Sequence, residues 1–327
     1  MKGNIFKGLW LLVIVSCVAT SCTTIKNSGL QSQIDKSNCN QQNTYHYTKD
    51  ELPKPLYQIE LDTILTNRFS KNSLNIAHAI GALDLITHYA HKSLEKNKRM
   101  TIDYRMELIE LNQQINHRID LASLEISALS SELDCEEERA NQIASFMKEK
   151  EGKIESFLNV SAIVIGAAGA VVTGILFAEA DGSNAADVIG ISTGLAEAVL
   201  GVLMLTVKTK VYFHHERNSL REVWFKTETS EVFPPSIWYY LNYFNPNEPD
   251  KLSLRDQVIK SWQNFGQVQD IKEKKKKQLI DIYFSQGGKY TADELENRAN
   301  MYDQLESVIK LMKQDLKDLM EELEKLK

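Results

Sequence analysis

The sequence predicts an all-α protein in which long coiled-coil helices flank a central, glycine-rich hydrophobic helical hairpin. Three observations support this fold class. Residues 161–178 and 188–207 are apolar runs joined by a short acidic loop. Residues 101–151 contain neither glycine nor proline and repeat apolar side chains at helical spacing. Residues 302–326 keep apolar side chains at every third or fourth position, which is the spacing of a coiled-coil seam.

Residues 1–21 form a predicted lipoprotein signal peptide. Lys2 and Lys7 precede a short apolar core at residues 9–18, which is the pattern of a secretory signal. The small residues of an Ala-Thr-Ser sequence come directly before Cys22. This ending resembles the lipobox of bacterial lipoproteins. The resemblance implies diacylglycerol on the Cys22 sulfur, an acylated amino terminus and a mature protein held on a membrane.

Alternatives for this segment stay open. Cys17, after Ile-Val-Ser, competes as the acylated residue, but cleavage there would leave an apolar core at the bottom of the usual range. An ordinary cleaved signal or a signal anchor with incidental cysteines is the other alternative. Thr23 replaces the aspartate that, by similarity to known sorting rules, retains lipoproteins at the inner membrane, and no acidic residue precedes Asp35. The resemblance therefore implies the bacterial cell envelope, with a lipid anchor in the outer membrane and the protein on its periplasmic face.

Residues 22–52 are rich in polar side chains and have few large apolar ones, which is typical of a flexible tether. Cys39 lies in this tether and Cys135 in a long predicted helix. An oxidising periplasm would permit a bridge between them or an intermolecular bond. No spacing of the cysteines argues for either.

Residues 53–156 are predicted to form an N-terminal helix and a coiled-coil stalk. The first helix begins at Ser70 or Ser73 and runs to about residue 95. The stalk covers residues 101–151, about 75 Å at 1.5 Å per residue, and Gly152 is its expected hinge. Its predicted seam contains Ile119, Ala122, Ile126, Leu129, Leu133, Ala140, Ile143, Met147 and Ile154.

Asp84, His88 and His91 share one face of the first predicted helix. Three such side chains offer a metal at most an incomplete set of ligands, because no second carboxylate and histidine motif elsewhere completes four. We therefore interpret them as surface or packing residues and predict no metal site.

The hydrophobic hairpin covers residues 157–207. Small residues recur at every fourth position in both of its helices, and such stripes let two helices approach closely. We expect them to face each other or another copy of the chain. The stripes are Gly166, Ala170 and Gly174 in the first helix and Gly190, Gly194 and Ala198 in the second. Glu197 lies in the middle of the second run, where an acidic residue opposes membrane insertion. The hairpin is therefore either two transmembrane helices or a core buried in a bundle or oligomer.

Residues 208–250 are an aromatic-rich cap, which is either an interfacial belt beside a membrane or a compact core. A short helix is expected to begin after Pro234 and to end near Pro246. Residues 251–327 hold C-terminal helices and a coiled coil. One helix is expected at residues 254–265, and Thr291 with Glu294 forms a capping box that begins the last one. The lysine-rich residues 272–277 are a solvated helix face or, alternatively, a contact for anionic lipid.

The sequence contains no phosphate-binding loop, nucleophile elbow, HExxH or CxxC motif, and it shows no strand pattern. We therefore predict a non-enzyme without cofactor or small-molecule substrate. The net charge of −6 gives no indication of nucleic-acid binding. The expected partners are membrane lipid and either further copies of the chain or a helical protein.

The order of long helices around an apolar hairpin resembles that of the α-helical pore-forming toxins of the hemolysin BL and cytolysin A type. In its hairpin, aromatic segment and C-terminal coil, the chain also resembles uncharacterised lipoproteins of Gram-negative envelopes. We hypothesise a lipid-anchored envelope scaffold or tether. The alternative is a membrane-inserting, pore-forming protein that uses residues 157–207.

Overall fold

The computed structural model describes residues 39, 44–94, 101–179, 184–206, 208–215, 217–248, 250–268 and 273–326. Of these residues 74% are helical and 4% are in strands, which confirms an all-α fold. The contacts divide the chain into two compact units. Among the described residues, the first unit contains 141–212 and 289–295, and the second contains 39–140, 213–288 and 296–326.

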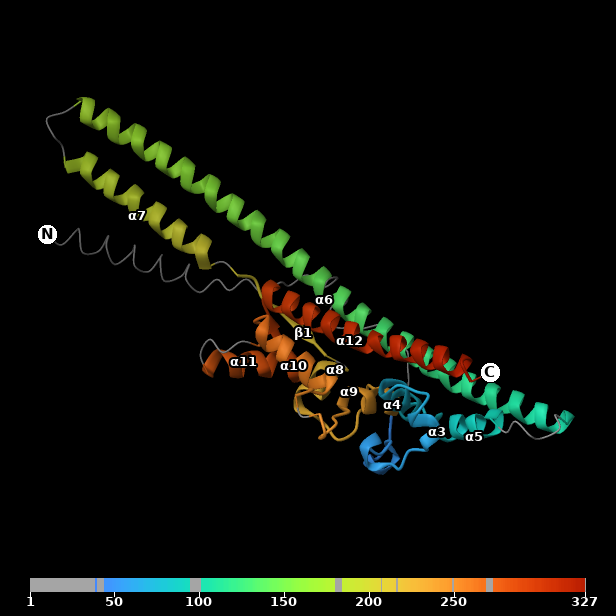
Figure 1. Cartoon of the computed structure of the whole chain (residues 1–327). Coiled ribbons are helices and arrows are strands. Elements are labelled where there is room, and N and C mark those ends of the chain that lie inside the picture. The colour runs from blue at the N-terminus through green and yellow to red at the C-terminus, as the bar shows by residue number, and fades with distance from the viewer. Residues whose placement is uncertain are drawn as a thin grey trace. The chain divides into compact units, whose positions relative to one another are not determined.

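Figure 1 labels the elements along the chain. In order they are η1 (Lys49–Glu51), η2 (Leu56–Gln58), α3 (Thr63–Thr66), α4 (Lys71–Ala79), α5 (Leu83–Leu94), α6 (Ile102–Glu179), α7 (Asn184–Thr206), β1 (Val211–His214), α8 (Ser219–Phe225), α9 (Pro235–Asn242), α10 (Leu254–Asn264), α11 (Glu273–Phe284), β2 (Gly287–Tyr290) and α12 (Ala292–Glu324).

The first predicted helix is two helices, α4 and α5. The side chain of Ser70 caps α4 by accepting a hydrogen bond from the Ser73 amide. Gly81 then takes a φ of +69°, and the Ala82 amide donates to the Ala77 carbonyl over 2.8 Å. A glycine in the left-handed region ends a helix at little cost. The apolar periodicity continues across this break, so periodicity alone did not reveal it.

Helix α6 runs through Gly152 without interruption, so the expected hinge is absent at that residue. One glycine in a helix interior costs only about 1 kcal/mol. A helix of 78 residues tolerates this because each added residue brings another hydrogen bond after nucleation.

Helices α6 and α12 line the core of the second unit. They lie antiparallel, because Ser127 accepts a hydrogen bond from Lys313 while Asp134 and Glu137 lie beside Glu306 (Figure 1). Both apolar seams are buried. The buried residues include Ile115, Ile119, Ala122, Ile126, Leu129 and Leu133 on α6, and Tyr302, Leu305, Ile309, Met312, Leu316, Leu319 and Leu323 on α12.

Strands β1 and β2 form a two-stranded sheet that the sequence did not predict. Gly287 has a φ of +115°, and a Cβ atom there would overlap the carbonyl oxygen of Phe213. Because Gly287 has no side chain, the two backbones can approach closely at this point.

The aromatic residues of the cap mostly form a core, which matches the compact-core alternative. Phe213, Phe233, Trp238, Tyr239 and Tyr240 are buried. Helix α9 begins at Pro235, and α10 ends before Gly266, which has a φ of +81°. Both helices agree closely with the expected ones.

The predicted capping box at the start of α12 is confirmed. The Thr291 amide donates to Glu294 Oε2 over 2.8 Å, and the Glu294 amide donates to Thr291 Oγ1 over 3.3 Å. Two amides that the helix itself leaves without a partner are satisfied in this way.

We expect Leu316→Asp and Leu319→Asp each to lower the free energy of unfolding by more than about 3 kcal/mol, because each buries an unpaired carboxylate. Leu319 is 0% exposed, whereas its neighbour Met320 is 43% exposed, so Met320→Asp is the matched control. Denaturant melts would measure the change. Equal stability of all three variants would show that α12 does not pack along this face.

Candidate functional site

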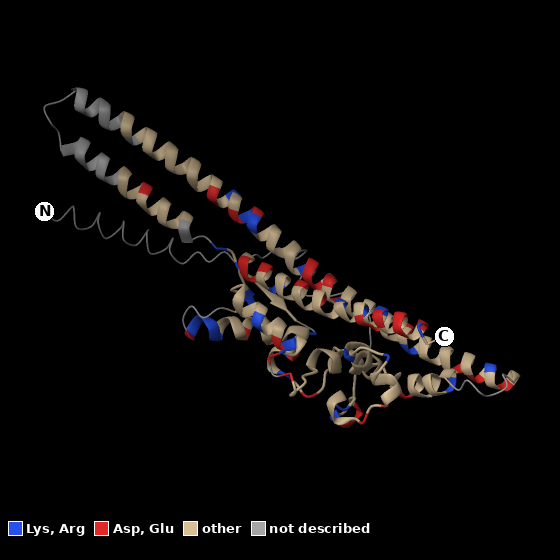
Figure 2. Cartoon of the chain, in the orientation of Figure 1, with Lys and Arg blue, Asp and Glu red and all other residues tan. Residues whose placement is uncertain are grey.

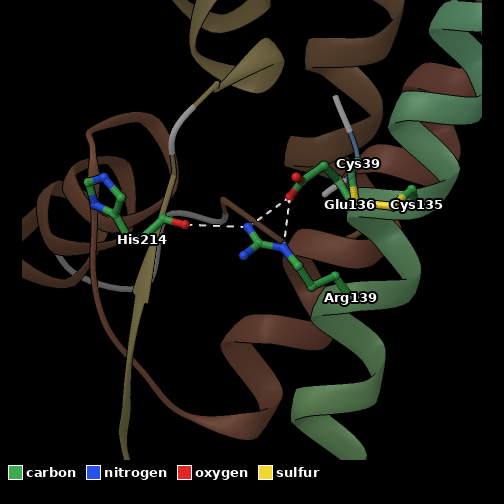
Figure 3. The surroundings of a disulfide bond; sticks show 5 residues. All are labelled: Cys39, Cys135, Glu136, Arg139 and His214. Atoms are coloured by element: carbon green, nitrogen blue, oxygen red, sulfur yellow. Dashed lines mark hydrogen bonds and ion pairs between the residues drawn. A yellow bond between two sulfur atoms is a disulfide. The ribbon is translucent and has the colours of Figure 1, made fainter. Parts of the chain in front are cut away.

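A disulfide between Cys39 and Cys135 joins the N-terminal segment to α6 (Figure 3). The two Cα atoms are 5.4 Å apart, and 96 residues separate the cysteines in the sequence. Sequence spacing left this pairing open. Closing a loop of that size stabilises a fold by roughly 4–5 kcal/mol in the chain-entropy model.

Residues 44–49 are also held by contacts with later segments of the second unit. The Tyr45 amide donates to the Glu231 carbonyl over 3.1 Å, and the Tyr47 hydroxyl donates to the Phe233 carbonyl over 3.0 Å. Lys49 forms an exposed ion pair with Glu228. The later part of the predicted tether therefore has defined contacts in the structure.

Two ion pairs lie near the disulfide. Arg139 pairs with Glu136 over 2.9 Å, donates to the His214 carbonyl over 3.3 Å (Figure 3), and stacks on the Phe213 ring. Arg217 pairs with Glu132 over 3.0 Å. Burial raises the pKa of Glu132, and the charge of Arg217 opposes that rise. Removing either arginine would leave a buried carboxylate without this compensation, which is strongly destabilising.

A third arginine, Arg298, is buried on α12. It donates to the Tyr283 carbonyl and to the Tyr302 hydroxyl, both over 2.8 Å. Burial lowers the pKa of His215 to about 2, and the charge of Arg298 adds to the effect. The His215 imidazole is therefore neutral at neutral pH, and these groups form a structural polar network.

The predicted hairpin residues lie in the first unit. A Cβ atom on Gly166 would overlap Oε1 of Glu197 on α7, so the carboxylate of Glu197 lies against the α6 backbone at this glycine. Figure 1 shows α7 running beside the last part of α6. One glycine of the predicted stripe thus makes room for the one acidic side chain in the second apolar run.

The other predicted stripe residues show no comparable contact in the described part of the chain. Ala170 and Ala198 are exposed, and a Cβ atom on Gly194 would meet nothing within 4 Å. Gly174 lies in α6 and Gly190 in α7, and the structure does not describe what surrounds either residue. Cys22, the predicted lipidation site, also lies outside the described residues.

The base of the hairpin is held by polar contacts. Glu151 accepts hydrogen bonds from the amide and the hydroxyl of the buried Thr209, over 2.6 and 2.7 Å. Lys208 pairs with Asp293 over 2.9 Å, and this contact lowers the pKa of the Asp293 carboxyl.

A continuous stretch of α6 exposes apolar side chains beyond this base. Phe157 is 71% exposed and Ile163 is 70% exposed. We call the apolar face the exposed large hydrophobic residues between positions 157 and 202, which are Phe157, Val160, Ile163, Val164, Val171, Leu195 and Val202. In the described part of the chain, no helix combines the length and the apolar composition needed to cross a bilayer. Residues 180–183 and 207 of the hairpin lie outside the described residues, so the transmembrane alternative for residues 157–207 stays a prediction.

The Asp84, His88 and His91 side chains are exposed on α5 and do not form a ligand cluster. His91 Nε2 lies 2.6 Å from Oδ2 of Asp62 instead. Among the described residues, the side chains with ligand atoms gathered within 4.8 Å are those of Asp134, Glu137 and Glu306. Asp134 is exposed and Glu306 is buried, and Lys310 pairs with Glu306 over 2.6 Å.

Comparison with known protein families, curated proteins and solved structures found no match for this chain. Its function must therefore be inferred from its own residues.

We expect replacement of both Cys39 and Cys135 by serine to lower the melting temperature by roughly 10 °C or more, because the unfolded chain regains the entropy of an open loop. Calorimetry with and without dithiothreitol would measure this. Reductant should lower the melting temperature of the wild type and leave that of the double variant unchanged. Alkylation of both thiols in native, exported protein would show that the bridge does not form.

Proposed function

We propose that this protein is a lipid-anchored helical scaffold or tether of the bacterial cell envelope, without catalytic activity. Acylated Cys22 holds it at the periplasmic face of the outer membrane, and its helical body binds further copies of the chain. The apolar face of the first unit is the observation that carries this proposal.

The apolar face has the properties of an association surface. Phe157, Val160, Val164 and Val171 recur at helical spacing, so they line one side of α6. Monomeric soluble proteins rarely expose contiguous apolar patches of this kind. A second copy presents the same stripe together with the small residues Ala170 and Gly194, which leave room for close approach. In a two-fold symmetric homodimer, both copies use the same surface patch.

The disulfide supports export. Structural disulfides persist in the periplasm and outside cells but are rare in the cytosol. The Cys39–Cys135 bond therefore agrees with the lipoprotein signal proposed for residues 1–21.

The proposed scaffold uses α6 and α12 as a coiled coil. Their buried seams and antiparallel course support this packing. The hairpin of the first unit carries the apolar face.

The buried polar groups support a structural role. Arg298 and Arg217 bond to backbone carbonyls, and His215 is neutral because of burial. These arrangements hold segments of the second unit together.

We expect Cys22→Ser to leave unacylated protein that no longer fractionates with outer membranes. Cys17→Ser is the matched control and should behave as the wild type. Fractionation of cells, with mass spectrometry of the amino terminus, would measure both. Loss of membrane association in the Cys17 variant alone would place the lipid on Cys17, and unchanged fractionation of both would reject a lipid anchor at either cysteine.

We expect Phe157→Ser with Val164→Ser to weaken self-association roughly a hundredfold, because each exposed apolar side chain loses most of the roughly 1.5–3 kcal/mol that its burial contributes. Analytical ultracentrifugation would measure the dissociation constant. Ile102 and Ile109 on the same helix are 77% and 57% exposed but lie in the second unit. Their replacement by serine is the control and should change nothing. A monomeric wild type would contradict the proposed oligomer.

A further inference from the structure

The second unit contains an open groove between α8 and α11. It has a volume of about 610 Å³, and its lining includes Phe225, Ile280 and Phe284 together with Lys274 and Lys277. Grooves that combine an apolar floor with a few polar groups are the usual form of a small-molecule or lipid site.

The aromatic part of this groove is built from both helices. Phe284 is buried and stacks on Trp224 with ring centroids 4.6 Å apart. Phe225, the last residue of α8, meets Phe284 edge to face at 6.3 Å but is 54% exposed. Phe284 therefore forms the floor of the groove, and the Phe225 ring forms a wall that remains open to solvent.

Positive charge is concentrated at one end of the groove. Residues 274–277 are four consecutive lysines at the start of α11, where Figure 2 shows them in blue. Lys274, Lys277, Asp281 and Phe284 share one face of the helix, because they lie three or four residues apart. Asp281 is the carboxylate in the lining, and the lysine run outweighs its charge. The chain as a whole carries a net charge of −6, so this is a local reversal of sign.

We propose that this groove binds an anionic phospholipid of the bilayer, with the phosphate between Lys274 and Lys277 and the glycerol and upper acyl region against Phe225. Lysines at a membrane surface attract anionic lipid, and an exposed aromatic ring fits the headgroup boundary. The inference deepens the proposed function, because a chain anchored through Cys22 has a bilayer within reach. The lipid contact itself requires no acyl anchor and is testable apart from it.

The test is partitioning of the full chain carrying Cys22→Ser into two kinds of vesicle. One contains phosphatidylcholine alone, and the other contains phosphatidylcholine with phosphatidylglycerol. The ratio of the two partition coefficients removes any apolar binding by the N-terminal segment, which both vesicles share. We expect the ratio to exceed one for this protein.

Lys274→Gln with Lys277→Gln should lower that ratio roughly thirtyfold, since each lysine near an anionic surface contributes about fivefold. Phe225→Ala should lower partitioning into the anionic vesicles roughly three- to tenfold. The exposed Lys260 and Lys325 provide the control pair, because their change to glutamine alters the net charge equally. Circular dichroism would verify that each variant is folded.

Three results would overturn the proposal. They are a ratio of one for the parent protein, an equal loss in the control pair, and full binding by Phe225→Ala. Full binding by Phe225→Ala would mean that the lysines attract the membrane surface electrostatically and that no lipid occupies the groove. None of them affects the Cys22 fractionation result, which tests the anchor separately.

Discussion

A long amphipathic helix must cover its apolar stripe, and α6 meets this constraint over only part of its length. At residues 115–133 the stripe is buried in the second unit, where α12 runs beside it. Between Phe157 and Val171 the same helix exposes five large apolar side chains, those of Phe157, Val160, Ile163, Val164 and Val171. The buried part is stabilised by about 25 cal/mol for each Å² of apolar surface that is removed from water. The uncovered part retains that driving force for association, which is why the proposed function depends on it.

The last helix and the capping box were predictable because their signals are local. The spacing of Leu305, Ile309, Met312 and Leu316 fixes which side of the helix is buried, whatever covers it. Breaks and pairings were less predictable. Gly81 ends a helix and Gly152 does not, although both interrupt a similar pattern. The difference is the left-handed conformation of Gly81, which has a φ of +69° and ends the helix.

The candidate sites depend on contacts between distant segments, so the sequence held little information about them. Cys39 and Cys135 lie 96 residues apart, and no motif links them. The partly buried Arg139 and Arg217 and the buried Arg298 have no local feature that separates them from surface arginines. The groove needs Phe225 and Phe284 to meet, and only its lysine run was visible beforehand. The hairpin stripes were visible as a pattern, yet Gly166 packs against Glu197 and not against another glycine.

The disulfide has two effects that differ in size: it shortens the proposed tether, and it stabilises the second unit by closing a loop. Cys22 and Cys39 are 17 residues apart, so the chain between them spans at most about 60 Å. Without the bridge the first described contact is Tyr45, only six residues later. The effective concentration of a tethered group falls roughly as the −3/2 power of the tether length, so lengthening the proposed tether by these six residues would lower it less than twofold. Loop closure contributes several kcal/mol in comparison. The bridge therefore acts mainly on the stability of the second unit, to which both cysteines belong.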